Sequence, residues 1–238
     1  MEKQMIIFKD LGRLNYQSAW DYQEKLLQEN LQKKATAQSN GGFCNTQHYL
    51  LFVEHPPVYT LGKNGNEANA LLSEERMKEK GIEFFRTNRG GDITFHGPGQ
   101  IVGYPILDLE KFDTDIGHYL RNLEEAVILT CADYDIEAGR SGVWIDAGSI
   151  GKERKICAIG VRCSRWVTMH GFAFNVNTDL NYFNFIVPCG IQNKQVTSLE
   201  KELGRKIDMQ EAKGRVKENF GKVFQAILQE EPGHHTVN

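Results

Sequence analysis

The sequence predicts an α+β fold in which a mixed or antiparallel sheet carries helices. Candidate strands outnumber candidate helices, and the two do not alternate regularly as they do in βαβ repeats. The chain has 238 residues, 40% of them hydrophobic, which is enough apolar material for a substantial core. Because we find no internal repeat and no obvious linker, residues 1–238 are expected to form a single domain.

The N-terminal part of the chain is predicted to hold two strands and a long helix. The apolar run at 5–8 predicts the first strand, and apolar residues at helical spacing predict a helix over 16–34. Residues 32–47 are polar and contain glycine, so a surface loop inserted after the helix is expected there. A strongly apolar strand is predicted over 48–54, and Pro56–Pro57 stops it.

The middle of the chain is predicted to form shorter elements. A strand over 58–62 precedes a short helix over 73–80, which Ser73 is placed to cap. Another strand is predicted over 82–87. A glycine-rich stretch then leads into an apolar strand over 101–109.

The C-terminal half is predicted to contain two helices separated by short strands. Asp113 and Thr114 are placed to open the first helix, which runs to about residue 134. Short strands follow at 141–145, 155–163 and 167–176. Asp208 and Glu211 form a potential capping box for the final helix, over 208–229. One face of that helix carries Met209, Ala212, Val216, Phe220, Val223 and Ile227. The polar tail from about residue 230 is expected to fray.

Composition and charge exclude several classes of protein. The formal net charge is −3, so there is no basic excess of the kind that neutralises the phosphates of a nucleic acid. No apolar run reaches the roughly 18 residues of a membrane-spanning helix, and the N-terminus lacks a signal-peptide pattern. The five cysteines contain no CxxC pair, so a structural zinc site or a disulfide framework is not expected. We expect a cytoplasmic protein without nucleic-acid or membrane partners.

The stretch RGGDITFHGPGQ, residues 89–100, is too rich in glycine for an ordinary core element. Glycine lets the backbone turn tightly or lie close to a ligand. The stretch is therefore either a plain hairpin connection or a loop against a substrate, with Arg89 and His96 as polar contacts. It matches neither phosphate-binding pattern, GxxxxGK[ST] or GxGxxG, so nucleotide binding is not supported.

Lysine 155 begins the apolar face of a predicted strand. Cys157, Ile159, Val161 and Cys163 follow it on that face, because side chains alternate along a strand. One interpretation is that Lys155 reaches solvent at the strand end. The other is that it lies near a partly desolvated site, where an ammonium group lowers the pKa of a thiol.

The predicted strand over 169–177 has one large apolar face and one small face. Phe172, Phe174 and Val176 alternate with Gly171, Ala173 and Asn175. Ordinary sheet packing explains the aromatic side chains, whereas the small face opens space for a narrow apolar slot such as an acyl chain needs. His170 is a potential base, although a single histidine is more often structural.

Among the five cysteines, Cys189 stands out because it lies between Pro188 and Gly190. Cys131, Cys157 and Cys163 are expected in the core, and Cys44 in a polar loop. A proline fixes the approach of the chain and a glycine exposes backbone N–H groups, which suits a positioned nucleophile. From these residues alone, a loop cysteine without a function is an equally open interpretation.

The residues RGGDITFHGPGQIVGY, 89–104, resemble the signature of the lipoyl(octanoyl) transferases: RGG, two residues, threonine, an aromatic residue, histidine, then glutamine and tyrosine at fixed offsets. Five further segments resemble that family in the same order: EHPPVYTLG, SGVWI, KICAIGVR, HGFAFNV and VPCGI. The similarity covers roughly residues 5–225. A signature of this length is far more specific than a single glycine motif.

The resemblance implies a fold, a reaction and a set of site residues. The fold is that of the biotin and lipoate ligase catalytic domains. The reaction moves an octanoyl group from acyl carrier protein to a lysine of a lipoyl domain, through a thioester on Cys189 whose thiol pKa is lowered by Lys155. The substrate-binding residues implied by position are Arg89, Gly90, Gly91, Asp92, Ile93, Thr94, Phe95, His96, Ala158, Ile159, Gly160, Gly171, Phe172 and Ala173.

The same resemblance implies the partners and the absence of a cofactor. The donor is octanoyl-acyl carrier protein, and the acceptors are lipoyl domains of 2-oxoacid dehydrogenases and the glycine cleavage H protein. No metal or other cofactor is implied, and we expect a monomer. Since both partners are typically acidic, five basic residues are candidates for docking them, each equally open to being ordinary surface charge: Arg121, Lys152, Arg154, Arg162 and Arg165.

Two other functions remain as alternatives. An ATP-dependent lipoate–protein ligase has the same fold, but it needs no cysteine and carries a glycine motif that this chain lacks. A catalytically silent acyl- or carrier-binding protein would need the apolar slot but not Lys155 and Cys189. Acylation of the chain by an octanoyl donor, and its ATP dependence, would separate the three.

Overall fold

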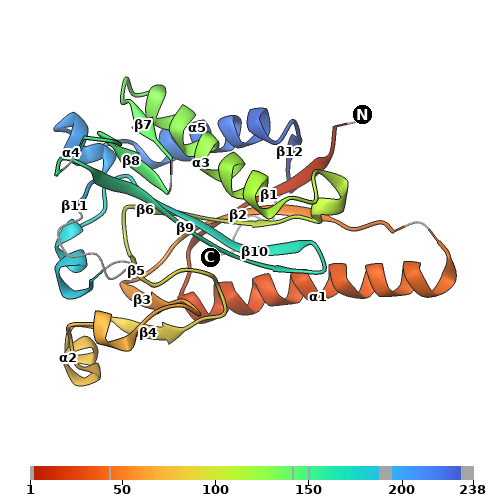
Figure 1. Cartoon of the computed structure of the whole chain (residues 1–238), viewed down its shortest axis with the longest axis horizontal. Helices are drawn as coiled ribbons and strands as arrows, with labels where there is room; N and C mark the ends of the chain where they lie inside the picture. The colour runs from red at the N-terminus through yellow and green to blue at the C-terminus, as the bar shows by residue number, and fades with distance from the viewer. Residues whose placement is uncertain (1–2, 43, 141, 150, 188–194, 232–238) are drawn as a thin grey trace, which may run out of the picture.

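The computed structural model describes residues 3–42, 44–140, 142–149, 151–187 and 195–231. It contains a large mixed sheet and a small sheet, with helices packed on both faces of the large one (Figure 1). The α+β class predicted from the sequence is therefore confirmed.

The large sheet has nine strands in the order β12-β1-β2-β6-β10-β9-β8-β7, with β11 also paired to β9. Strands β12, β1 and β2 are mutually parallel, β11 is parallel to β9, and the other neighbours are antiparallel. The strands are β1 (Met5–Arg13), β2 (His48–Glu54), β6 (Gln100–Ile106), β7 (Ala138–Gly139), β8 (Val143–Ile145), β9 (Arg154–Ser164), β10 (Val167–Asn175), β11 (Gln195–Val196) and β12 (Ile227–Glu230).

The small sheet has three strands, in the order β4 (Glu83–Arg86), β3 (Val58–Leu61) and β5 (Ile93–His96). Strand β5 ends at His96 and β6 begins four residues later in the large sheet. The glycine-rich stretch 89–100 therefore connects two sheets and is not the plain hairpin considered from the sequence.

The helices cover the two faces of the large sheet. Helices α3 and α5 lie together on one face and α1 lies on the other, as Figure 1 shows. Their bounds, with those of the shorter helices, are α1 (Tyr16–Asn40), α2 (Glu74–Glu79), α3 (Ile116–Ala132), α4 (Leu199–Leu203) and α5 (Met209–Val223). Short 3₁₀ segments lie at Glu67–Asn69, Leu109–Lys111 and Leu180–Phe185.

Each face of the sheet has its own apolar core. Phe172, Phe174 and Val176 of the β10 segment pack towards α3 and α5, as the alternation in the sequence predicted. Ala173 points into the second core, beneath α1. The small side chains of β10 therefore lie on the face that α1 covers.

Helix α1 is longer than the sequence predicted. It continues to Asn40 and ends where Gly41 adopts a left-handed conformation, with φ of 62°. The expected loop insertion at 32–47 is therefore wrong for its first nine residues. Within this helix, Lys34 pairs with the fully buried Asp108 at 2.7 Å.

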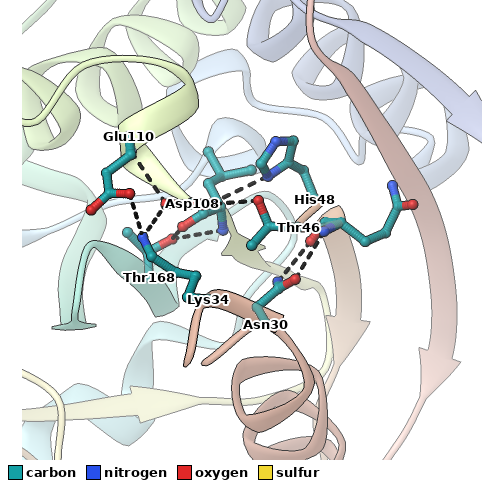
Figure 2. Close-up of polar contacts among 9 residues, drawn as sticks. Asn30, Lys34, Thr46, His48, Asp108, Glu110 and Thr168 are labelled. Carbon is teal, nitrogen blue, oxygen red and sulfur yellow. Dashed lines mark hydrogen bonds and ion pairs between the residues drawn. The ribbon is translucent and has the colours of Figure 1, made fainter. Parts of the chain in front are cut away.

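The contacts around Asp108 join the end of α1 to the large sheet (Figure 2). Its other carboxylate oxygen accepts a hydrogen bond from Thr46 Oγ1 at 2.9 Å. Its backbone N–H donates to Nδ1 of His48, and burial lowers the pKa of His48 to about 4. His48 is therefore held in its neutral form at neutral pH.

Two helix boundaries also differ from the prediction. Helix α3 is capped by Asp115, whose side chain accepts from the N–H of His118, and not by Asp113 or Thr114. Helix α5 begins after Asp208, as predicted, but ends at Val223. Residues 227–230 form β12 beside β1, so Ile227 is not part of the helical stripe and is half exposed.

Candidate active site

A cavity that is partly open to solvent lies among β9, β10, α1 and the loop before β5. Twelve of the fourteen substrate-binding residues expected from the sequence line it, together with Lys155. They are Arg89, Gly91, Asp92, Ile93, Thr94, His96, Ala158, Ile159, Gly160, Gly171, Phe172 and Ala173.

The cavity has a buried base and a half-exposed rim. Tyr16, Tyr104 and His170 are each at most 3% exposed and belong to the base. Lys155 and Thr94 are partly exposed and belong to the rim.

Arg89 holds the glycine-rich loop in shape. Its buried guanidinium donates to the carbonyls of Thr60, Gly90 and Asp92 at 2.6, 2.9 and 2.8 Å. Gly91 has φ of 87°, which a residue with a side chain rarely adopts. Arg89 was expected as a polar contact for a substrate. In the structure it also fixes the backbone of this loop.

The loop also lies directly against β9. The N–H of Gly90 donates to the carbonyl of Val161 at 2.9 Å. A Cβ atom on Gly160 would lie 2.8 Å from the Gly90 carbonyl oxygen, closer than real contacts allow. Glycine at position 160 is therefore required for the loop and the strand to meet at the cavity.

The small face of β10 forms another wall, as the sequence predicted. Ala173 and Gly171 line the cavity. A Cβ atom on Gly171 would lie 2.2 Å from the carbonyl oxygen of Gly103 on β6. This glycine therefore permits close strand packing as well as leaving room for a ligand.

Lys155 lies at the rim with its Nζ 4.7 Å from the centroid of the Trp144 ring, a cation–π contact. Its carbonyl accepts from the N–H of Thr197, and Val196 of β11 pairs with it. The side chain is thus half-buried at the cavity and does not extend freely into solvent.

Two expected binding residues do not line the cavity, and one residue expected to be catalytic lies outside the described part of the chain. Gly90 contacts β9 through its backbone. The ring of Phe95 points the other way and stacks on Tyr182, with centroids 4.5 Å apart. Phe95 belongs to the apolar core of the small sheet, because side chains alternate along β5. Cys189 falls in residues 188–194, outside the described residues.

The carboxylate of Asp92 is occupied within the protein. It accepts from Asn69 Nδ2 at 2.6 Å and from the N–H of Ile93 at 2.7 Å. Its carboxylate therefore holds the loop before β5 in place at the cavity.

The histidines around the cavity are neutral. Burial and the charge of Arg89 lower the pKa of His170 to about 3, and its Nε2 lies 2.7 Å from Asn88 Oδ1. Burial lowers the pKa of His96 well below its ordinary value, with His55 and Arg89 acting in the same direction. A general base that must be protonated and deprotonated near neutral pH is not provided by these rings.

Sequence reasoning missed seven residues that line the cavity. Gln100 and Tyr104 were visible as members of the signature, and Asn175 as a member of the small face. The other four gave no local signal, because distant elements bring them together: Tyr16, Val102, Phe183 and Val196.

The other cysteines are placed much as expected. Cys131 and Cys157 are buried in the first core, and burial raises the pKa of both thiols. Cys163 packs against that core but is only partly buried. Cys44 is half exposed in the segment after α1.

Comparison with known proteins identifies the family. The lipoyl protein ligase A/B catalytic domain matches residues 15–221. The octanoyltransferase of Christiangramia forsetii is 55% identical over 225 residues, covering 92% of this chain and 96% of that protein. The octanoyltransferase of Flavobacterium johnsoniae is 55% identical over 228 residues, covering 94% of this chain and 98% of that protein.

The chain belongs to the octanoyltransferase family. As a member of this family it is an acyltransferase, which agrees with a cavity whose walls are mostly apolar. Solved structures agree on the fold. A bipartite lipoate protein ligase from Thermoplasma acidophilum has a TM-score of 0.70 at 17% identity, covering 97% of this chain and 87% of that one. A lipoate-protein ligase A bound with ATP has a TM-score of 0.65 at 17% identity, covering 97% and 89%.

Two further expectations concern membrane-spanning helices and basic residues that could dock a partner. None of the described helices is both long and apolar enough to span a membrane. Of the five basic docking candidates, Arg154 pairs with Glu202 and Arg162 with Glu24. These two charges are partly neutralised within the protein, which leaves Arg121, Lys152 and Arg165 as the stronger candidates.

Proposed function

We propose that this chain transfers an octanoyl group from octanoyl-acyl carrier protein to a specific lysine of lipoyl domains, by way of a thioester on Cys189. The family supports the acyl group and the reaction class. The observation that carries the proposal is the apolar cavity that β9 and β10 line together with α1 and the loop before β5, with Lys155 and small residues in its wall. Such a cavity accommodates a linear acyl chain and leaves its carbonyl near the rim.

In the first step the Cys189 thiolate attacks the carbonyl carbon of the donor thioester. A new C–S bond forms, the bond to the carrier's sulfur breaks, and the carrier leaves as a thiolate that takes a proton from the ammonium of Lys155, which becomes neutral. A free thiol has a pKa of about 8.5, so an ammonium group nearby is needed to favour the reactive thiolate. Lys155 supplies that charge in this proposal.

In the second step the amine of the acceptor lysine attacks the Cys189 thioester. An amide forms, Cys189 leaves as a thiolate, and the surplus proton of the amine passes to neutral Lys155. Exchange of one thioester for another is nearly balanced in energy, whereas thioester to amide is strongly downhill. No nucleotide or metal is required by this sequence of bonds.

The proposed setting follows from the reaction. The proposed acceptors are lipoyl domains of 2-oxoacid dehydrogenases and the glycine cleavage H protein, and the proposed setting is the cytoplasm, at the first step of lipoate synthesis. We treat residues 1–238 as one catalytic domain that acts as a monomer. Lysine-bound octanoate is the product.

Transfer of octanoate from octanoyl-carrier protein to a purified lipoyl domain, without ATP, tests the proposal. We expect one octanoyl group per lipoyl domain, and no product with Lys155→Ala. Dependence on ATP and free octanoate would show a ligase instead. Binding of the donor without any transfer would show a silent binding protein.

A further inference from the structure

A chain of buried polar side chains runs beneath the cavity, from β11 to the glycine-rich loop. Its members are Asn175, Gln100, His96 and Thr60, and each is at most 6% exposed. Each comes from a different strand: β10, β6, β5 and β3. Four buried polar residues in one continuous line are costly unless every group is paired.

The end of the chain next to β11 fixes the direction in which its hydrogen bonds run. Asn175 Nδ2 donates to the carbonyl of Thr197 at 3.0 Å, and a carbonyl can only accept. Asn175 Oδ1 therefore faces Gln100, whose Nε2 donates to it at 2.9 Å and to the Phe95 carbonyl at 3.2 Å. Gln100 Oε1 is left as an acceptor, 3.0 Å from His96 Nδ1.

The other end is compatible with the same direction. His96 Nδ1 must carry the proton to donate to Gln100, so its Nε2 is an acceptor, 3.2 Å from Thr60 Oγ1. The Thr60 hydroxyl donates to it and in turn accepts from Nη2 and Nε of Arg89 at 2.9 and 3.3 Å. Guanidinium can only donate, so one arrangement fits both ends, and every link is satisfied.

The two ends of this chain contact two different parts of the cavity wall. Arg89 holds the carbonyls of Gly90 and Asp92 in the loop wall. Thr197 donates its N–H to the carbonyl of Lys155 in the other wall. The chain therefore connects the loop to the strand segment that carries the rim lysine.

We propose that Thr60, His96, Gln100 and Asn175 are positioning residues for acyl transfer, which fix the loop of Arg89 relative to Lys155. This proposal rests on the proposed function. Thr60 is the most informative member because it does not line the cavity, so its effect must pass through other residues. His96 was expected from the sequence to contact the substrate. In this proposal its neutral ring connects Gln100 to Thr60.

A matched pair of variants tests the proposal. Thr60→Ser keeps the hydroxyl, whereas Thr60→Val keeps the shape and removes it. We expect Thr60→Val to lower kcat/KM for octanoyl-carrier protein about 100-fold, since small displacements of positioning groups have effects of that size. The loss should include a raised donor KM. The kcat/KM of Thr60→Ser should stay within about threefold of that of the parent protein.

The KM separates positioning from loss of folded protein. A variant that is partly unfolded has less active enzyme, so kcat falls while the donor KM stays constant. Equal kinetics for the two Thr60 variants, or a fall in kcat with unchanged KM, would overturn the proposal. An inactive parent protein would instead count against the proposed function.

A spectroscopic measurement tests the chain without any activity and without a variant that must fold. Histidine-labelled protein should show His96 as the neutral ring protonated at Nδ1, from pH 8 down to pH 5, by ¹⁵N NMR. A ring protonated at Nε2, or a charged ring in that range, contradicts the direction of the chain and with it the proposal.

Discussion

Acid should destabilise this protein steeply, because it buries several histidines in neutral form. Burial lowers the pKa of His48 and His55 to about 4 and that of His170 to about 3. An unfolded histidine has a pKa of about 6.5 and binds a proton below that pH. The unfolded state therefore takes up protons that the folded state refuses, and stability is lost as pH falls from about 6.5 towards 4.

The magnitude follows from the number of protons. Each proton bound only by the unfolded state changes the free energy of unfolding by about 1.4 kcal/mol per pH unit. The three histidines together give a slope of about 4 kcal/mol per pH unit between roughly pH 6 and 5, a window above the titration of most carboxylates. His96 adds to the slope in the same direction. Against a typical stability of about 5–15 kcal/mol, one pH unit removes a large share.

Urea unfolding at pH 6.5, 6.0, 5.5 and 5.0 measures the slope. His48→Asn isolates one proton, because Asn Oδ1 can replace Nδ1 as the acceptor for the N–H of Asp108 (Figure 2). We expect this variant to have a slope smaller by about 1.4 kcal/mol per pH unit.

Asn30→Ala is the matched control. It removes two hydrogen bonds to the backbone of Gln47 and should lower stability by a similar amount at each pH. A free energy of unfolding that is the same at pH 6.5 and 5.0, or an unchanged slope in His48→Asn, would refute the reasoning.

Three further predictions concern a turn, an ion pair and the cavity. Replacing Arg165–Trp166 with Asn–Gly should raise stability by about 1–2 kcal/mol in thermal melts, because both residues have positive φ in the β9–β10 hairpin; a lower melting temperature would contradict this. Lys34→Met should cost about 3 kcal/mol in urea unfolding, since it leaves Asp108 buried without its partner, and a loss below about 1 kcal/mol would show that Asp108 is otherwise satisfied. Ala173→Leu should lower kcat/KM for octanoyl donors about tenfold more than for butanoyl donors, because it fills the cavity wall; equal effects would place the acyl chain elsewhere.

The sequence pattern correctly predicted those strands in which side chains of the two faces alternate along the strand. The alternation of β9 and β10 correctly assigned Cys157, Phe172 and Phe174 to the core and Ala173 to the opposite face. The end of α1 could not be predicted in this way. Its last turns are polar and have no apolar spacing. The ion pair between Lys34 and Asp108, which joins this part of the helix to the sheet, is a contact between residues far apart in the chain.

The prediction for residues 227–230 was wrong for a similar reason. Ile227 continues the apolar spacing of α5, so the sequence favours a longer helix. The structure instead pairs residues 227–230 with β1, more than two hundred residues away in the chain. Such pairing leaves no trace in a local window.

The candidate site was predicted as a list of residues, but not as a geometry. In the structure, Lys155 and most of the residues that the resemblance implies line one cavity. The resemblance did not separate residues that face the cavity from those that face away, such as Phe95, or those that hold the loop, such as Arg89 and Asp92. Those distinctions depend on contacts between strands far apart in the sequence.

The central claim is that an octanoyl group is carried on Cys189. Intact mass of the protein after mixing with octanoyl-carrier protein, followed by peptide mapping, tests this most directly. We predict a gain of one octanoyl group on the peptide that contains Cys189, its loss on addition of a lipoyl domain, and no gain in Cys189→Ala. An unmodified protein that still transfers octanoate, or an adduct that persists in Cys189→Ala, would contradict the account.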